Sequence, residues 1–177
     1  AILGLSGQPQ TFTKEIIEAM AEINERPLIS ALSNPTSKAE CTAEQAYKWS
    51  KGRAIFASGS PFDPVKYGNR TFVPGQGNNA YIFPGVGLGA IVSRSHVVTD
   101  DMFLAAAHSL ANLVTEDDLQ RGRVYPPLSH IREVSAHIAH DVATMVYDKG
   151  YTDKERPEDI MADIREYMFQ PIYPHYA

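Results

Sequence analysis

The side chains best suited to bind a small molecule in this sequence are amides. Asn34 closely follows an uncharged run, Pro27–Leu32, whereas Asn78 and Asn79 end a stretch rich in glycine. An asparagine amide offers two N–H donors and one acceptor oxygen without a charge, so it can hold a carboxylate or a hydroxyl. Asparagine is also common in turns before proline and at the start of helices. Residue types alone leave both interpretations open.

A second pattern has the spacing of a phosphate-binding loop. Gly85–Ala90 matches G-x-G-x-x-A as a string of letters. Such a loop must follow a strand, open a helix and precede an acidic residue by about 20 positions. Here Phe83–Pro84 precedes the string, and Leu104–Ala107 is neutral. The sequence therefore favours close packing of a helix through small residues over nucleotide binding.

Other residues of catalytic types lack the partners that their chemistry needs. The histidines show no metal-ligand spacing, and we expect solvated or capping roles for them. Asp100–Asp101 and Asp117–Asp118 fall in first helical turns, where capping and the helix dipole explain them. Cys41 precedes a helix, which could lower its thiol pKa, but no histidine lies beside it in sequence. We therefore expect neither a catalytic nor a metal-binding residue in this chain.

Alternating strands and helices must position the amides within the first 80 or so residues. Short apolar runs predict strands at Ala1–Leu5, Pro27–Leu32 and Ala54–Ala57, with helices at Lys14–Ile23 and from Thr42 to Trp49. In open α/β sheets, ligand crevices lie at the carboxyl ends of the strands, which is where Asn34 is expected.

Ser58–Asn79 differs from the segments on either side of it. Glycine, proline, serine and asparagine dominate this stretch, and only Arg70–Val73 has the character of a strand. A loop of this length in a compact domain is usually functional. Gly75 and Gly77 would let its backbone approach a ligand closely.

Beyond Asn79 the pattern is helical. The expected segments are Tyr81–Val92, Asp100–Leu113 capped by Thr99, a short turn capped by Thr115, His130–Tyr147 stopped by Gly150, and Arg156–Phe169 begun by Pro157. The tail after Phe169 is expected to be irregular. The predicted fold class is therefore α/β over the first part of the chain, followed by helices.

Composition and charge exclude several classes of protein. The chain has 177 residues, of which 44% are hydrophobic and 21% charged, which suits one globular domain. A net charge of −5 argues against a nucleic-acid groove or an anionic membrane surface. The single Cys41 cannot form an internal disulfide, and no apolar run has the length of a membrane span. We expect an intracellular protein without nucleic-acid or membrane partners.

The start of the sequence carries a separate signal. Ala1–Leu5 is apolar, has no initiator methionine and no charged region before it, and so is unlike a signal peptide. A chain that opens on a core strand suggests that the neighbours of that strand lie elsewhere. We therefore expect a fragment of a larger protein, without the segment that would carry a targeting signal.

Several stretches of the chain together resemble the C-terminal half of malic enzymes. They are Ser33–Tyr47 (SNPTSKAECTAEQAY), Phe56–Val65 (FASGSPFDPV), Pro74–Gly89 (PGQGNNAYIFPGVGLG) and Gly122–Leu128 (GRVYPPL). The resemblance extends from about Gly4 to about Tyr147. These motifs in one order are far more specific than any one of them alone.

The resemblance implies a domain organisation and an activity. Residues 1–79 would be the C-terminal part of a Rossmann-like NAD(P)-binding domain, residues 80–150 a helical segment packing on the malate-binding domain, and residues 151–177 a C-terminal helix and tail. The activity would be oxidative decarboxylation of (S)-malate to pyruvate and CO2, with NAD or NADP and with Mg2+ or Mn2+.

The resemblance also implies roles for particular residues. Asn34 and Asn79 would contact malate, in agreement with the argument from amide chemistry. The residues expected beside the cofactor are Asn78, Ser33, Gly7 and Gly59.

The family's remaining active-site groups have no counterpart in this sequence. Its general-base lysine, acid tyrosine, metal-binding carboxylates, malate-binding arginine and G-x-G-x-x-A loop all lie upstream of the resembling region. We therefore expect the chain alone to be inactive, with its metal ligands outside it and the upstream part of the same enzyme as its partner. The full enzyme is expected to be a homo-oligomer, a dimer or tetramer, in the cytoplasm, with a mitochondrial or plastid location left open.

Two alternatives remain at this point. A malolactic-type enzyme resembles the same family but makes lactate without releasing reduced cofactor, and these motifs do not separate the two. A non-catalytic assembly module could instead use the helices after Tyr81. The preference between NAD and NADP is also open, because the ribose-phosphate contacts of the family belong to upstream sequence.

Overall fold

The computed structural model describes residues 1–172 and leaves residues 173–177, the end of the predicted irregular tail, outside the described range. The chain divides into two compact units. The first joins Ala1–Asn79 to Ala111–Leu128, and the second joins Ala80–Leu110 to Ser129–Ala177. These units are defined by compactness alone, so the assignment of residues 1–79, 80–150 and 151–177 to the domains of an enzyme stays a prediction.

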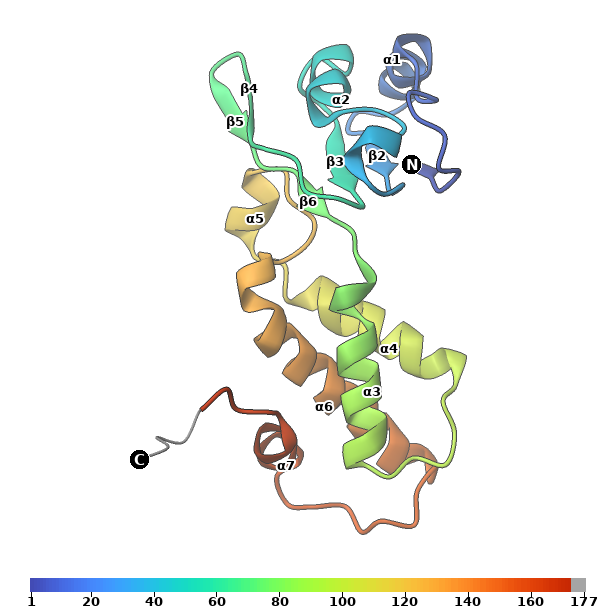
Figure 1. Ribbon diagram of the computed structural model, residues 1–177, viewed down its shortest axis with the longest axis vertical. Coiled ribbons are helices and arrows are strands. Elements are labelled where there is room, and N and C mark those ends of the chain that lie inside the picture. The colour runs from blue at the N-terminus through green and yellow to red at the C-terminus, as the bar shows by residue number, and fades with distance from the viewer. Residues whose placement is uncertain (173–177) are drawn as a thin grey trace, which may run out of the picture. The chain divides into compact units, whose positions relative to one another are not determined.

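A parallel sheet forms the centre of the first unit (Figure 1). Its strands, in spatial order, are β1 (Ile2–Gly4), β2 (Leu28–Ala31), β3 (Ile55–Ser58) and β6 (Gly75–Gln76). Each neighbouring pair is parallel, and the pairing aligns the last residues of the strands: Gly4 with Ala31, Ala31 with Ser58, and Ser58 with Gln76. The strands therefore end level with one another, and the loops that follow them leave the sheet at one edge.

Helices α1 (Lys14–Ile23) and α2 (Ala43–Trp49) connect the first three strands, as predicted. The predicted capping box at the start of α2 is present, since Gln45 N donates to Thr42 Oγ1 and Thr42 N donates to Gln45 Oε1. Ile17, Ile29, Phe56 and Tyr47 are fully buried in the core between these elements. The alternation of strand and helix, with a parallel sheet, confirms the predicted α/β class.

The prediction for Ser58–Asn79 was wrong in part, because this stretch contains more β-structure than its composition indicates. Val65–Tyr67 (β4) and Arg70–Phe72 (β5) form an antiparallel hairpin whose two-residue turn begins at Gly68, with φ +60°. β6 then returns to the sheet as a neighbour of β3. The hairpin is tied to the core by the ring of Phe72, which stacks on Tyr47 at 4.4 Å between ring centroids.

Strand β1 is less buried than its apolar sequence predicts. Leu3 is 60% exposed and Leu5 is 75% exposed, whereas Gly4 between them is buried. β1 lies at the edge of the sheet, so only one side of the strand has a strand neighbour within the described residues.

The longer helices after Asn79 are α3 (Phe83–Val92), α4 (Asp100–Asn112), α6 (Ile131–Lys149) and α7 (Ile160–Tyr167). They confirm the prediction that the rest of the chain is helical. Gly150 ends α6 in the left-handed conformation, as expected. None of the helices within residues 1–172 combines the length and the apolar character needed to cross a bilayer.

Helix α4 begins at Asp100 as predicted, but its predicted cap was wrong, and so was the predicted start of the last helix. Thr99 does not cap α4 through its side chain, because its Oγ1 atom is buried without a hydrogen-bond partner in the described part of the chain. The last helix begins at Ile160 rather than Arg156, because Asp159 accepts a hydrogen bond from Ala162 N at 2.9 Å and so provides the cap.

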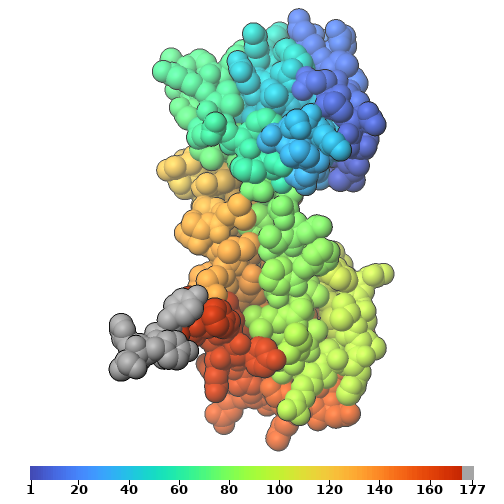
Figure 2. Space-filling model, viewed as in Figure 1, coloured from blue at the N-terminus to red at the C-terminus, as the bar shows by residue number. Residues whose placement is uncertain are grey.

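The glycines of the G-x-G-x-x-A string lie inside helix α3, and Gly85 and Gly89 pack it against α6. A Cβ added to Gly85 would lie 2.6 Å from Ile138 Cβ, and one added to Gly89 would lie 2.7 Å from the carbonyl oxygen of Ala139. A Cβ on Gly87 would meet nothing within 4 Å. Figure 2 shows α3 in green directly against α6 in orange. The string is a helix-packing motif, as predicted, and not a nucleotide-binding loop.

Because Gly89 is in close contact with α6, replacing it with alanine should destabilise the second unit. We expect Gly89→Ala to lower the free energy of unfolding by about 1–3 kcal/mol, the usual cost of overpacking. Urea unfolding followed by circular dichroism measures this change. Gly87→Ala is the matched control and should be neutral or stabilising by up to about 1 kcal/mol, because alanine favours the helix. Equal stability of the two variants would contradict this packing.

Candidate functional site

The carboxyl edge of the sheet gathers every residue to which the sequence assigned a binding role. Gly7 lies in the loop after β1, Ser33 and Asn34 in the loop after β2, and Gly59 directly after β3. Asn78 and Asn79 follow β6. Because the strands are parallel and end level, these loops lie side by side. β2 and β6 are separated by β3 alone, which places their axes roughly 10 Å apart.

Ser33 joins the loops after β1 and β2. The backbone N–H of Gly7 donates to Ser33 Oγ at 2.9 Å. Ser33 Oγ in turn donates to Glu40 Oε1, and Ser33 N donates to Glu40 Oε2 at 3.4 Å. Ser33 is 7% exposed and Glu40 is fully buried. The hydroxyl of Ser33 is thus engaged on both sides by protein groups.

Asn34 is held by the loop after β3 and keeps its amino group available. Ser60 Oγ donates to Asn34 Oδ1 at 2.5 Å. The Nδ2 group of Asn34 has no hydrogen-bond partner within residues 1–172, and the residue is exposed. A Cβ on Gly59 would lie 2.8 Å from Asn34 Oδ1, so Gly59 lets the two loops approach closely. Asn34 therefore presents two N–H donors at the sheet edge.

The loop after β6 contacts the loop after β2 through Gly77. Gly77 N donates to Ser58 O at 2.8 Å, which extends the β3–β6 pairing by one residue. A Cβ on Gly77 would lie 3.0 Å from Leu32 Cδ2 and 3.2 Å from the hydroxyl oxygen of Tyr125. The sequence suggested that Gly75 and Gly77 make room for a ligand. In the structure they make room for Tyr125 and Leu32.

Asn78 and Asn79 are both exposed directly beyond this contact. Asn79 begins a 3-10 turn, η2 (Asn79–Tyr81), and its side chain has no hydrogen-bond partner within the described range. The amide of Asn79 is therefore a second neutral donor group, and it lies in a loop at the same edge of the sheet as Asn34.

Tyr125 is a residue of this edge that sequence reasoning missed. Its ring lies beside β6, where a Cβ on Gly75 would come 3.3 Å from Tyr125 Cδ2. The GRVYPPL stretch signalled the family resemblance but gave no contact, because Tyr125 is 50 positions beyond Gly75 in the sequence. Only the fold brings the two together.

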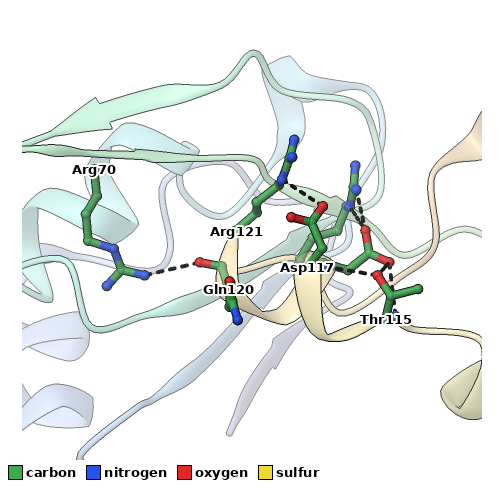
Figure 3. A network of polar contacts seen from close by, with 7 residues as sticks. Arg70, Thr115, Asp117, Gln120 and Arg121 are labelled. Carbon is green, nitrogen blue, oxygen red and sulfur yellow. Dashed lines mark hydrogen bonds and ion pairs between the residues drawn. The ribbon is translucent and has the colours of Figure 1, made fainter.

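Tyr125 belongs to the second stretch of the first unit, Ala111–Leu128. Helix α5 (Glu116–Gln120) and the turn after it hold this stretch against the first, Ala1–Asn79. Figure 3 shows Arg70 reaching the backbone oxygen of Gln120, at 3.3 Å, and Arg121 beside Asp117, at 3.0 Å. Val73 N also donates to the carbonyl of Arg121 at 3.2 Å. These contacts connect the segment to β5 and to the residue that follows it.

Asp118 is the buried anchor of this segment. It completes the predicted cap with Thr115, whose Oγ1 accepts from Asp118 N at 3.2 Å, and it accepts from Arg123 Nε at 2.9 Å. Burial would raise the pKa of the Asp118 carboxyl, but hydrogen bonds from Thr115 and the Arg123 guanidinium together hold it below its ordinary value. The charge of Asp118 is therefore satisfied within the first unit.

Cys41 has the environment of a structural residue. It is fully buried, and burial together with the neighbouring Glu40 carboxylate raises the pKa of its thiol to about 12. Cys41 therefore stays protonated at neutral pH, which supports the structural interpretation over a nucleophilic one.

The described residues do not provide a metal site. Within residues 1–172 no three His, Cys, Asp or Glu side chains are grouped closely enough to hold an ion. His96 pairs with Asp153 at 3.0 Å and His140 with its neighbour Asp141 at 3.1 Å, both at the surface.

The amides gathered at the sheet edge can bind a ligand but do not transfer protons. Amides at Asn34 and Asn79 and the hydroxyl of Ser60 can position a carboxylate, a hydroxyl or an amide of a ligand. Glu40, the carboxylate that Ser33 contacts, is fully buried. Together, a parallel α/β sheet and a neutral polar edge define part of a nucleotide-binding fold of the Rossmann type, with its ligands at the carboxyl ends of the strands.

Comparison with known proteins gives the family. The family model described as "Malic enzyme, NAD binding domain" matches residues 1–147. The chain is 54% identical to the NADP-dependent malic enzyme of Vitis vinifera and 57% identical to NADP-dependent malic enzyme 2 of Arabidopsis thaliana. Each match covers 99% of this chain and 30% of the relative. The chain therefore belongs to the malic enzyme family and spans about a third of the length of these relatives.

A solved structure agrees with this assignment. The malic enzyme of Pyrococcus horikoshii superposes with a TM-score of 0.66 at 25% identity, over 93% of this chain and 33% of that one. The resemblance inferred from the sequence motifs and the Rossmann-like α/β class are both confirmed.

The buried charge of Asp118 should contribute strongly to stability. We expect Asp118→Asn to lower the free energy of unfolding by about 1–3 kcal/mol at neutral pH, because it weakens hydrogen bonds to a buried charged group. The folded state lowers the pKa of Asp118, so this contribution is complete above the unfolded-state pKa, about 3.9, and is lost as pH falls through the folded-state pKa. Urea unfolding across this pH range measures the difference.

Asp117→Asn is the matched control for this prediction. The ion pair of Asp117 with Arg121 is exposed, so its loss should cost at most about 1 kcal/mol. A wild-type advantage over Asp118→Asn that stays constant down to pH 2 would show that the carboxylate is not stabilised as described.

Proposed function

We propose that this chain forms the nucleotide-side wall of the active site of an NADP-dependent malic enzyme. The enzyme would convert (S)-malate to pyruvate and CO2 with reduction of NADP. The observation that carries the proposal is the convergence of Asn34, Asn79 and the cofactor candidates on one edge of a parallel sheet. The choice of NADP over NAD is supported by the names of relatives that are 54–57% identical to this chain.

Asn34 and Asn79 are proposed to bind malate. Both amides are exposed, and each has donor groups without a partner in the described range. Asn34 is also oriented, because Ser60 occupies its oxygen and leaves Nδ2 for the substrate. A neutral amide suits a substrate that loses a carboxylate during the reaction, because it binds the anion without opposing the change of charge.

Gly7, Ser33, Gly59 and Asn78 are proposed to form the surface against which the cofactor lies. Gly7 has φ +68°, and a Cβ there would meet nothing within 4 Å, so this part of the edge is open. Ser33 would act mainly by fixing Gly7, since its hydroxyl already serves Gly7 and Glu40. NADP, when bound, supplies the hydride acceptor.

A divalent metal, Mg2+ or Mn2+, is proposed as the second cofactor of the whole enzyme. Residues 1–172 do not offer the grouped ligands that it needs, so the metal would be held by other parts of the enzyme. The role left to this chain is to bind and orient substrate and nucleotide.

We also propose the remaining partners. Malate and pyruvate are the substrate and product, and the upstream part of the same enzyme completes the site. A homo-oligomer in the cytoplasm is proposed for the full enzyme, and the reduced, buried thiol of Cys41 suits that compartment.

Replacing a malate-binding amide should weaken transition-state binding. In the enzyme that contains this chain, we expect Asn79→Ala to lower kcat/KM for malate roughly 5- to 160-fold. This corresponds to a loss of about 1–3 kcal/mol of transition-state binding free energy. Steady-state NADPH formation at 340 nm measures the change. Asn69→Ala is the control, since Asn69 is exposed in the hairpin turn between β4 and β5. Unchanged kcat/KM for Asn79→Ala would assign this residue a structural role.

The 177-residue chain alone should not oxidise malate. It brings neutral binding groups to the site, and its G-x-G-x-x-A string is used in helix packing. We expect no malate-dependent NADPH formation by the purified chain with NADP and Mg2+, under conditions in which the full enzyme is active. Turnover by the chain alone would contradict the division of roles proposed here.

A further inference from the structure

Glu40 is a buried acidic residue with no role in the function described so far. Its exposed fraction is 0%, and it follows the loop that carries Ser33 and Asn34. A carboxylate is costly to bury unless several hydrogen bonds compensate it. The contacts of Glu40 therefore indicate what its position in the fold achieves.

The side chain of Glu40 lies between strand β1 and the loop after β2. A Cβ on Gly4 would overlap the Glu40 side chain, with Oε2 at 2.7 Å, so the last residue of β1 must be glycine to admit it. Oε1 accepts from Ser33 Oγ and Oε2 from Ser33 N. The backbone carbonyl of Glu40 accepts from Phe12 N at 3.0 Å. Glu40 thus contacts the end of β1, the segment before α1 and the loop after β2.

The hydrogen bonds through Ser33 have a fixed direction. A serine hydroxyl has one proton, and here the proton is directed to Glu40, because a carboxylate only accepts. The oxygen of Ser33 is then free to accept the N–H of Gly7. The relay runs from Gly7 N–H to the Ser33 hydroxyl and on to Glu40, and each member orients the next.

We propose that Glu40 is a positioning residue that sets the geometry of the substrate and cofactor loops through Ser33. By holding both the hydroxyl and the backbone N–H of Ser33, it fixes the residue directly before Asn34 and, through Gly7, the loop after β1. This proposal rests on the proposed function, since it assigns Glu40 to the same site.

The substitution Glu40→Gln tests the direction of the relay with almost no change in shape. The oxygen of the new amide can still accept from Ser33 N, but its amino group can only donate to Ser33 Oγ. The hydroxyl proton of Ser33 then loses its acceptor and must turn away from residue 40, while its oxygen would have to accept from the introduced amino group as well as from Gly7 N–H. The loops after β1 and β2 lose their fixed register without the creation of a cavity.

In the full enzyme we expect Glu40→Gln to raise the KM for malate at least tenfold, with a smaller change in kcat. Hydrogen–deuterium exchange of the peptide that contains Gly7 should become faster, a readout that does not depend on turnover. Glu22→Gln is the control, because Glu22 is exposed on α1, and it should leave both measurements unchanged.

Ser33→Ala is the second variant, and it tests whether Glu40 acts through Ser33. It removes one oxygen and should reproduce the rise in KM. The double variant should be no worse than Ser33→Ala alone, because the two residues form one relay. If Glu40→Gln does not fold, Ser33→Ala alone decides, and a wild-type KM for Ser33→Ala overturns the proposal.

The outcomes separate this inference from the function on which it rests. A wild-type enzyme that does not oxidise malate would reject the proposed function. An active enzyme with a lowered kcat/KM in Asn34→Ala, but with wild-type KM and exchange in Glu40→Gln, would reject the role of Glu40 alone. Additive effects of Glu40→Gln and Ser33→Ala on kcat/KM would also overturn the relay.

Discussion

Main-chain hydrogen bonds between parallel strands hold the ends of β1, β2, β3 and β6 at one level, and the candidate site depends on this alignment. Gly4, Ala31, Ser58 and Gln76 are matched across the sheet, so the loops after them leave at a common edge. A shift of one residue in any pairing would turn that strand's side chains to the other face and displace its loop. The sheet therefore determines which loops meet, while the loop residues determine what they bind.

Contacts beyond the sheet then fix the loops themselves. Ser33 and Glu40 connect the loops after β1 and β2, Ser60 orients Asn34, and Leu32 contacts Gly77 in the loop after β6. The groups left facing outward are amides, whereas the one carboxylate in this arrangement is turned inward. An edge of this kind is suited to recognise the hydrogen-bonding pattern of a ligand rather than its charge.

Local signals predicted most of the elements, because their causes lie within a few residues. The capping box at Thr42 and the stop at Gly150 fixed helix ends that the structure reproduces. Strand β6, Gly75–Gln76, could not be predicted in this way, since glycine disfavours strands and only pairing with β3 makes this segment extended. The contacts of Tyr125 and Glu40 are also products of the fold. Asn34 was visible from its residue type and its position after a strand, and Asn79 from its residue type at the end of the glycine-rich loop.

The burial of Cys41 has a practical consequence. It is the one thiol of these 177 residues, and it lies fully buried in the hydrophobic core of the first unit. A covalent label can reach it only when that core opens. The rate of labelling at this position would therefore report how often the first unit opens, without the introduction of an engineered cysteine.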